Sequence, residues 1–165
     1  MRVWTFTEYI RRILARFGGA FLVLLYWKIT KNKSSRTRAI ILNADKSKIL
    51  LVKNITVKDF HLPGGGIDGQ ETPETAVIRE VKEELGINTT ILYKLGRYLY
   101  QGTNKYVDIF VTQTESEEFF MQWELDAAEW FSIKNLPILR KTTKQAIRDF
   151  LAHNQPTTGV WGLDD

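Results

Sequence analysis

The stretch that decides the fold runs from Gly65 to Ile87 and reads GGIDGQETPETAVIREVKEELGI. It begins with a glycine-rich turn. After the turn, Thr72 suits a helix N-cap and Pro73 suits the first helical position. Gly86 is placed for a left-handed C-cap. The spacing therefore predicts a helix over residues 73–85.

Glutamates gather on one face of this predicted helix. At about 100° per residue, one stripe is apolar and consists of Val77, Ile78, Val81 and Leu85. The adjoining face carries Glu80, Glu83 and Glu84. Like charges one turn apart destabilise a helix slightly, so helix stability gives no reason for this cluster. A divalent ion such as Mg²⁺ or Mn²⁺ does give a reason, because it prefers oxygen ligands. Arg79 is placed to pair with Glu83 four residues later and to fix its side chain.

The whole run resembles the Nudix box, which reads G-x5-E-x7-R-E-U-x-E-E-x-G-U with U a bulky aliphatic residue. Every fixed position is met, by Gly65, Glu71, Arg79, Glu80, Val81, Glu83, Glu84, Gly86 and Ile87. The resemblance implies an α/β fold, a Nudix-type α/β/α sandwich with a mixed sheet. It also implies a pyrophosphohydrolase: metal-dependent attack of water on a diphosphate linkage in a nucleoside diphosphate joined to another group. ADP-ribose-like compounds, dinucleoside polyphosphates and nucleotide sugars are of this kind.

Metal ligands and a general base are assigned on these grounds. Glu80, Glu83 and Glu84 are the predicted ligands of Mg²⁺ or Mn²⁺, and the resemblance implies that the carbonyl of Gly65 or Gly66 completes the shell. The resemblance also points to Glu124, in the loop ahead of Trp130, as the base. Glu124 is otherwise a surface acid, and its rivals are Glu115, Glu117 and Glu118. Glu71 is expected to make a structural bond. The candidate catalytic residues are therefore Arg79, Glu80, Glu83, Glu84 and Glu124.

Candidate substrate-binding residues surround the box: Phe60, His61, Gly64, Gly65, Arg97 and Tyr106. Glycines let a phosphate or a metal come close to the backbone. Aromatic side chains, Phe60 and Tyr106 among them, can stack on a base. His61 is one of two histidines and is either a hydrogen-bond donor to substrate or a packed residue. Nothing in the sequence selects the base or the leaving group.

Composition indicates one globular domain. The chain has 165 residues, of which 44% are apolar and 25% charged. It has no cysteine, which excludes a disulfide framework, a thiolate metal site and a cysteine nucleophile and fits a cytoplasmic location. Residues 1–38 hold nine of the 23 Lys and Arg but one of the 19 Asp and Glu. Because the basic character lies in this extension, no specific nucleic-acid partner is expected for the core.

Residues 1–37 are predicted to form a basic helical extension. Apolar residues recur at helical spacing over residues 4–17, with basic residues opposite. The apolar run over 17–27 is about half of the roughly 20 residues of a membrane span, so we predict no span. One alternative is packing on its own domain or on a partner subunit, which leaves a homodimer open. The other is peripheral membrane contact through residues 4–27.

Two alternative functions accompany these features. Membrane contact would suit a hydrolase of lipid or prenyl diphosphates. A non-catalytic Nudix-fold binding or regulatory module is the second alternative, and the intact box argues against it. A nucleotide substrate is the partner that the resemblance favours.

The Nudix domain is predicted over residues 38–152. Strand composition covers residues 39–43, 49–53, 89–100, 105–112 and 129–133, and a closing helix covers 140–152. This order matches a mixed sheet between helices. Residues 34–38 are predicted to be a linker, and residues 153–165 an irregular tail.

Overall fold

The structure is a computed structural model that describes residues 35–55, 58–100, 104–122, 125–152 and 157–161. The predicted helical extension falls almost wholly outside these residues, as does the proposed membrane contact of residues 4–27. All described residues belong to one compact unit, residues 34–165. Neither of the helices described is long and apolar enough to cross a membrane.

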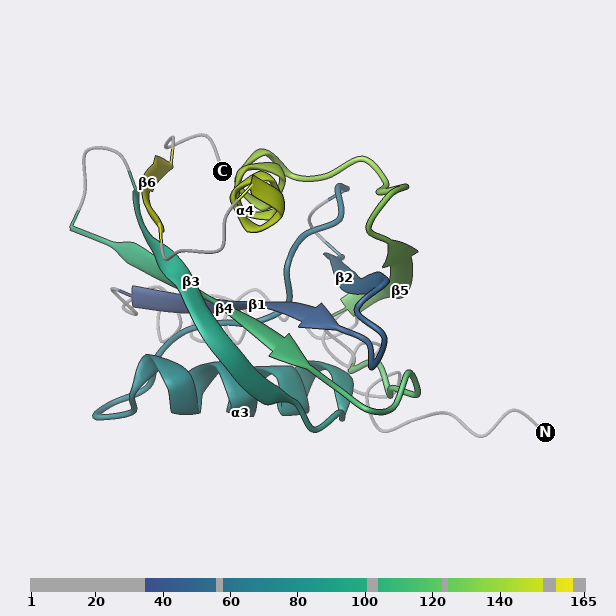
Figure 1. Ribbon diagram of the computed structural model, residues 1–165. Helices are drawn as coiled ribbons and strands as arrows, with labels where there is room; N and C mark the ends of the chain where they lie inside the picture. The colour runs from purple at the N-terminus through teal and green to yellow at the C-terminus, as the bar shows by residue number, and fades with distance from the viewer. Residues whose placement is uncertain (1–34, 56–57, 101–103, 123–124, 153–156, 162–165) are drawn as a thin grey trace, which may run out of the picture. The chain divides into compact units, whose positions relative to one another are not determined.

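A mixed sheet of six strands forms the centre of this unit (Figure 1). The strands lie in the order β5-β2-β1-β4-β3-β6. Their bounds are Ser35–Leu42 for β1, Lys48–Asn54 for β2, Thr90–Tyr100 for β3, Tyr106–Gln113 for β4, Leu125–Ser132 for β5 and Thr157–Trp161 for β6. β1 pairs with β4 and β3 with β6 in parallel, and the other neighbours are antiparallel. The predicted mixed α/β architecture is confirmed.

Two helices cover opposite faces of the sheet, α3 (Pro73–Leu85) and α4 (Lys141–Ala152) (Figure 1). The alternation of side chains along β1 explains this arrangement, because successive residues of a strand point to opposite faces. Ile40 packs in one buried cluster with Ile147 of α4, and Ile41 packs in the other with Val81 of α3. β1 therefore belongs to two hydrophobic cores at once.

Helix α3 has the predicted ends. The hydroxyl of Thr72 accepts a hydrogen bond from the Thr75 N–H at 3.2 Å, which satisfies one of the free donors of the first turn. Gly86 has a φ of 69° and donates its N–H to the Lys82 carbonyl. These caps confirm the predicted bounds of the helix.

Two stretches predicted to be irregular are strands, and both predictions were wrong. Residues 35–38 form the first half of β1, in parallel register with residues 106–109 of β4. In the predicted tail, residues 157–161 form β6 and pair in parallel with β3. The strands that pair with these two stretches lie far away in the sequence, so no local sequence pattern predicts the pairings. β5 also begins earlier than predicted, at Leu125.

The glycine loop, residues 63–66, lies beside the first part of β1, where β1 and β2 are no longer paired. β1 and β2 pair only at Ile41–Leu50 and Leu42–Ile49. Beyond these pairs, the Ala39 N–H donates to the Pro63 carbonyl and the Thr37 N–H donates to the Gly65 carbonyl, each at 2.9 Å. These bonds attach the loop to the centre of the sheet.

Replacing Leu85 tests the core beneath α3. Leu85 is fully buried, so we expect Leu85→Ala to lower the free energy of unfolding by about 2–5 kcal/mol in urea titrations. Leu92→Ala is the control: Leu92 is 39% exposed, and its replacement should change stability by about 0.5 kcal/mol or less. Equal losses in the two variants would contradict the described packing of α3.

Candidate active site

The guanidinium group of Arg79 donates hydrogen bonds to three carboxylates, and a fourth, that of Asp68, lies 3.7 Å from Nη2. Nε and Nη2 donate to the two oxygens of Glu71 at 3.0 and 2.9 Å. Nη1 donates to Glu80 at 3.0 Å and to Glu83 at 2.9 Å. Nη2 also donates to the carbonyl of Gly66 at 3.1 Å. The predicted pair with Glu83 is present, and it is one part of a larger network.

Glu71 closes the turn that leads into α3. Its carboxylate accepts the Asp68 N–H at 3.2 Å, and its own N–H donates to the Asp68 carbonyl at 2.8 Å. Hydrogen bonds from Arg79 lower the pKa of Glu71, and the same bonds raise the pKa of Arg79. Both groups are therefore charged at neutral pH, and Glu71 has the structural position expected of it.

Glu80 and Glu84, one helical turn apart, lie against the glycine loop. Glu84 accepts the N–H of Gly64 at 2.8 Å. The carboxylate of Glu80 occupies the space that a side chain on Gly65 would need, because a Cβ there would overlap its atoms. A glycine at position 65 therefore allows the close approach of Glu80 to the backbone.

Arg38 of β1 contacts the other side of the glycine loop. Its Nη1 donates to the carbonyl of Gly64 and, at 3.3 Å, to the carbonyl of Leu62. Gly64 has a φ of 125°, a conformation that favours glycine. Sequence reasoning missed Arg38 because the stretch was interpreted as a linker; the available signal was a charged residue directly before a buried apolar run.

The predicted substrate-binding residues divide between the two faces of the sheet. Arg97 pairs with the fully buried Asp108 through two bonds of 2.8 Å and stacks on Tyr106, with its guanidinium carbon 3.8 Å from the ring centroid. By strand alternation, Asp108 faces α3. Phe60 packs instead against the core beneath α4. The structure therefore does not bring Arg97 and Tyr106 together with Phe60 and the adjacent His61.

Glu124, the predicted base, lies outside the described residues. Its chain neighbours are attached to the last turn of α3. The Gln122 N–H donates to the Glu84 carbonyl at 2.9 Å, and the Leu125 N–H donates to the Gln122 carbonyl at 3.1 Å. Among the rivals, Glu117 accepts from Asn43 at 2.8 Å and from Lys48 at 2.7 Å, so it is engaged in a surface network.

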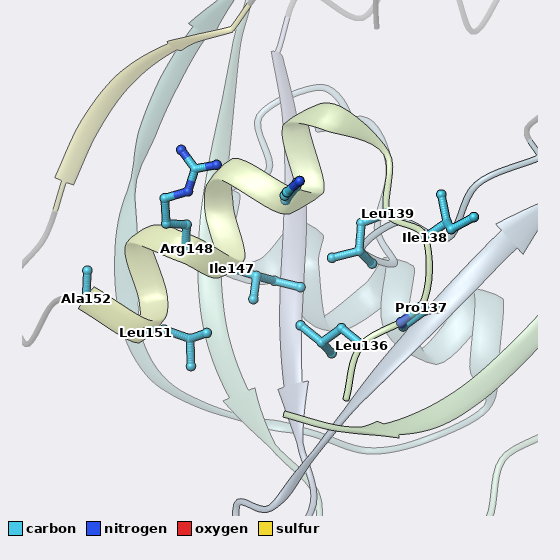
Figure 2. A pocket seen from close by; sticks show the side chains of 9 residues that line it. Leu136, Pro137, Ile138, Leu139, Ile147, Arg148, Leu151 and Ala152 are labelled. Atoms are coloured by element: carbon cyan, nitrogen blue, oxygen red, sulfur yellow. The ribbon is translucent and has the colours of Figure 1, made fainter. Parts of the chain in front are cut away.

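An apolar hollow lies along α4 (Figure 2). Residues from the loop before the helix and from the helix itself line it, including Leu136, Ile138, Ile147 and Leu151. None of its lining residues is an acid. This hollow therefore offers no carboxylate ligands for a metal.

A comparison with protein families decides the identity of the fold. The family model described as NUDIX domain matches residues 33–153. The chain belongs to the Nudix hydrolases. Curated relatives are named for diphosphate chemistry: one from Bacillus subtilis is provisionally named an 8-oxo-dGTP diphosphatase (34% identical, covering 67% of this chain and 75% of that one). Another, from Methanocaldococcus jannaschii, is named ADP-ribose pyrophosphatase (33% identical, covering 64% and 66%).

Solved structures share the fold of this Nudix hydrolase. A Nudix hydrolase from Nitrosomonas europaea matches with a TM-score of 0.66 at 19% identity, covering 77% of this chain and 78% of that one. An ADP-ribose pyrophosphatase from Streptococcus suis matches with a TM-score of 0.59 at 23% identity, covering 79% and 100%. At these identities the likeness shows the fold alone.

Nudix hydrolases generally use divalent metal ions, and the residues of this site fit such an ion. Glu80 and Glu84 bring carboxylate oxygens to the loop, and the Gly65 carbonyl, which accepts from Thr37, has a second lone pair. Glu83, the third predicted ligand, is 61% exposed and paired with Arg79. No group of three acids or histidines is assembled for a metal within the described ranges.

Replacing Gly65 tests the contact between Glu80 and the glycine loop. Because a Cβ would displace the Glu80 carboxylate, Gly65→Ala should weaken Mn²⁺ binding, measured by electron paramagnetic resonance, by about 10-fold or more. Gly69→Ala is the control, since a Cβ there meets nothing within 4 Å. Because Gly69 has a φ of 49°, the Gly69→Ala substitution should be slightly destabilising, but it should leave the metal affinity unchanged. Wild-type Mn²⁺ affinity in Gly65→Ala would remove Glu80 from the ligand set.

Proposed function

We propose that this Nudix hydrolase cleaves the diphosphate linkage of a nucleoside diphosphate joined to another group, using Mg²⁺ or Mn²⁺. The observation that carries the proposal is the position of the carboxylates of Glu80 and Glu84 against the glycine loop. ADP-ribose-like compounds, dinucleoside polyphosphates and nucleotide sugars are the candidate substrates. The names of the relatives support a diphosphate linkage and differ in the compound that carries it.

Three residues would bind the metal ion, and a fourth positions the ligands. Glu80 and Glu84 would hold the ion, with the carbonyl of Gly65. When bound, such an ion neutralises phosphate charge and lowers the pKa of water. Arg79 is a positioning residue, because its bonds fix the side chains of Glu80 and Glu83 and compensate their mutual repulsion.

Glu124 is our proposed general base. It follows Gln122 by two residues, and the Gln122 N–H donates to the backbone carbonyl of Glu84. The next described residue, Leu125, donates its N–H to the Gln122 carbonyl, so the described residues on both sides of Glu124 lie beside the last turn of α3. A carboxylate there can take a proton from a water molecule that attacks the diphosphate.

Phosphate release from a panel of compounds tests this function. The panel holds ADP-ribose, NADH, diadenosine polyphosphates, nucleotide sugars, nucleoside triphosphates and a prenyl diphosphate, with Mg²⁺ or Mn²⁺ and a coupling phosphatase. We expect cleavage of a nucleoside diphosphate compound that stops when EDTA removes the metal. Cleavage of the prenyl diphosphate alone would favour a lipid substrate. Metal binding without any cleavage would point to a substrate outside the panel, and the absence of both would favour a binding module.

Two variants in the same helix complete this test. Glu84→Gln should lower turnover of the preferred compound by about 100-fold or more while leaving the unfolding midpoint close to wild type. The matched control is Glu74→Gln, an exposed acid at the opposite end of α3, which should retain activity. Near wild-type turnover in Glu84→Gln would contradict the proposed metal site.

A further inference from the structure

A small polar cavity lies between the residues just before the glycine loop and the start of α4, on the side of the sheet that α4 covers. Its polar lining residues are Arg38, His61, Tyr100, Arg140, Thr142 and Thr143. Its volume of about 20 Å³ admits one oxygen-sized group, because roughly 10–15 Å³ is needed for a water molecule. The cavity is therefore suited to one oxygen of a larger group whose remainder stays at the mouth.

The first turn of α4 concentrates positive charge at this cavity. A helix N-terminus carries free N–H groups and a partial positive charge, and usually has an acid or a short polar cap. Here Arg140 precedes the helix, Lys141 begins it, and the first turn of α4 contains no acid. The first helical bond runs from the Lys144 N–H to the Arg140 carbonyl. An anion would balance this charge.

His61 supplies an independent sign of a ligand. Its side chain is 4% exposed, and Nδ1 lies 3.1 Å from the Leu62 carbonyl, to which it must donate its hydrogen. Burial, together with the charge of Arg38, lowers the pKa of His61 to about 4, so the ring is neutral at pH 7. Nε2 is then a buried acceptor with no hydrogen-bond partner among the described residues. An unmatched buried acceptor is costly, and a ligand that donates a hydrogen bond would remove the cost.

We propose that this cavity is the inner end of a phosphate subsite: one oxygen of a phosphate monoester, which the substrate carries in addition to its diphosphate linkage, enters it. Charged oxygens of the monoester accept from Arg38 and Arg140. The second proton of such a phosphate has a pKa near 6, so about a tenth of the free monoester keeps a P–OH at pH 7 and can donate it to Nε2 of His61. A carboxylate is fully ionised at pH 7 and supplies no such hydrogen. A neutral group does not match two guanidinium groups.

The subsite adjoins the proposed reaction centre, and the proposal rests on the function proposed above. Gly64 links the two places: its carbonyl accepts from Arg38, and its N–H donates to Glu84. One residue of the loop therefore separates the cavity from a predicted metal ligand. A single substrate that extends past this residue can place its diphosphate at the glutamates and one oxygen of a second phosphate in the cavity.

Matched substrate pairs test the subsite. NADH and NADPH differ by one phosphate monoester, as do ADP-ribose and its 2′-phosphate. We expect kcat/KM for the phosphorylated member of the cleaved pair to be higher by about tenfold or more, the strength of a charge-assisted hydrogen bond. Arg140→Gln should reduce this ratio to within about twofold of one, and Arg140→Lys should retain part of it. The control is Arg148→Gln, on the helix that follows Arg140 but lining the apolar hollow of Figure 2, which should keep the full ratio.

Direct binding separates a failure of the subsite from a failure of the proposed function. The two histidines, His61 and His153, give two sets of ring signals in long-range ¹H–¹⁵N spectra, assigned with His153→Gln. Millimolar inorganic phosphate should shift the signals of His61 saturably and leave His153 unchanged, while sodium chloride of equal ionic strength shifts neither. Unchanged His61 signals would overturn the subsite even if no compound of the panel were cleaved. Shifted His61 signals with equal cleavage of both pair members would limit the site to free phosphate and overturn its role in substrate binding.

Discussion

The interaction on which the site depends is the set of hydrogen bonds between Arg79 and its carboxylates. Glu80 and Glu83 belong to one helix, and Glu71 belongs to the turn before it, so three negative charges gather around one guanidinium group. Without a cation among them, their repulsion would oppose the helix and the turn together. Because Arg79 also donates to the Gly66 carbonyl, it fixes the glycine loop and the helix as one unit. Arg79 therefore fixes both the backbone and the carboxylates of the site.

Features that depend on near neighbours could be predicted from the sequence. The bounds of α3 follow from its caps, and the pair of Arg79 with Glu83 follows from helical spacing. Features that depend on distant partners could not. The first half of β1 contains polar residues and is a strand because β4 supplies its hydrogen bonds, and β6 is a strand because β3 does. Arg38 lies in the first half of β1. Because that strand was not predicted, its contact with Gly64 was missed as well.

The placement of substrate-binding candidates shows a second limit. Strand alternation says which residues share a face, but not which helix covers that face. Arg97 and Tyr106 face the α3 side, where the buried Asp108 pairs with the partly exposed Arg97, a contact that no sequence spacing reveals. His61 is almost fully buried near the start of α4, a position that depends on the path of the loop after β2. The ends of α3 and its Arg79–Glu83 pair were therefore predictable, whereas the surroundings of the substrate-binding candidates were not.

The pairing of β6 with β3 has a consequence for association between molecules. Without β6, residues 96–100 of β3 would present a row of backbone N–H and C=O groups along the border of the sheet. Such a border is a template on which strands of other molecules can add, and a long flat border is the more hazardous kind. β6 pairs with these five residues, and its own outer edge is equally short. A segment far from the glutamates in the sequence thus forms the edge of the sheet beside β3, and its pairing removes a surface on which strands of other molecules could add.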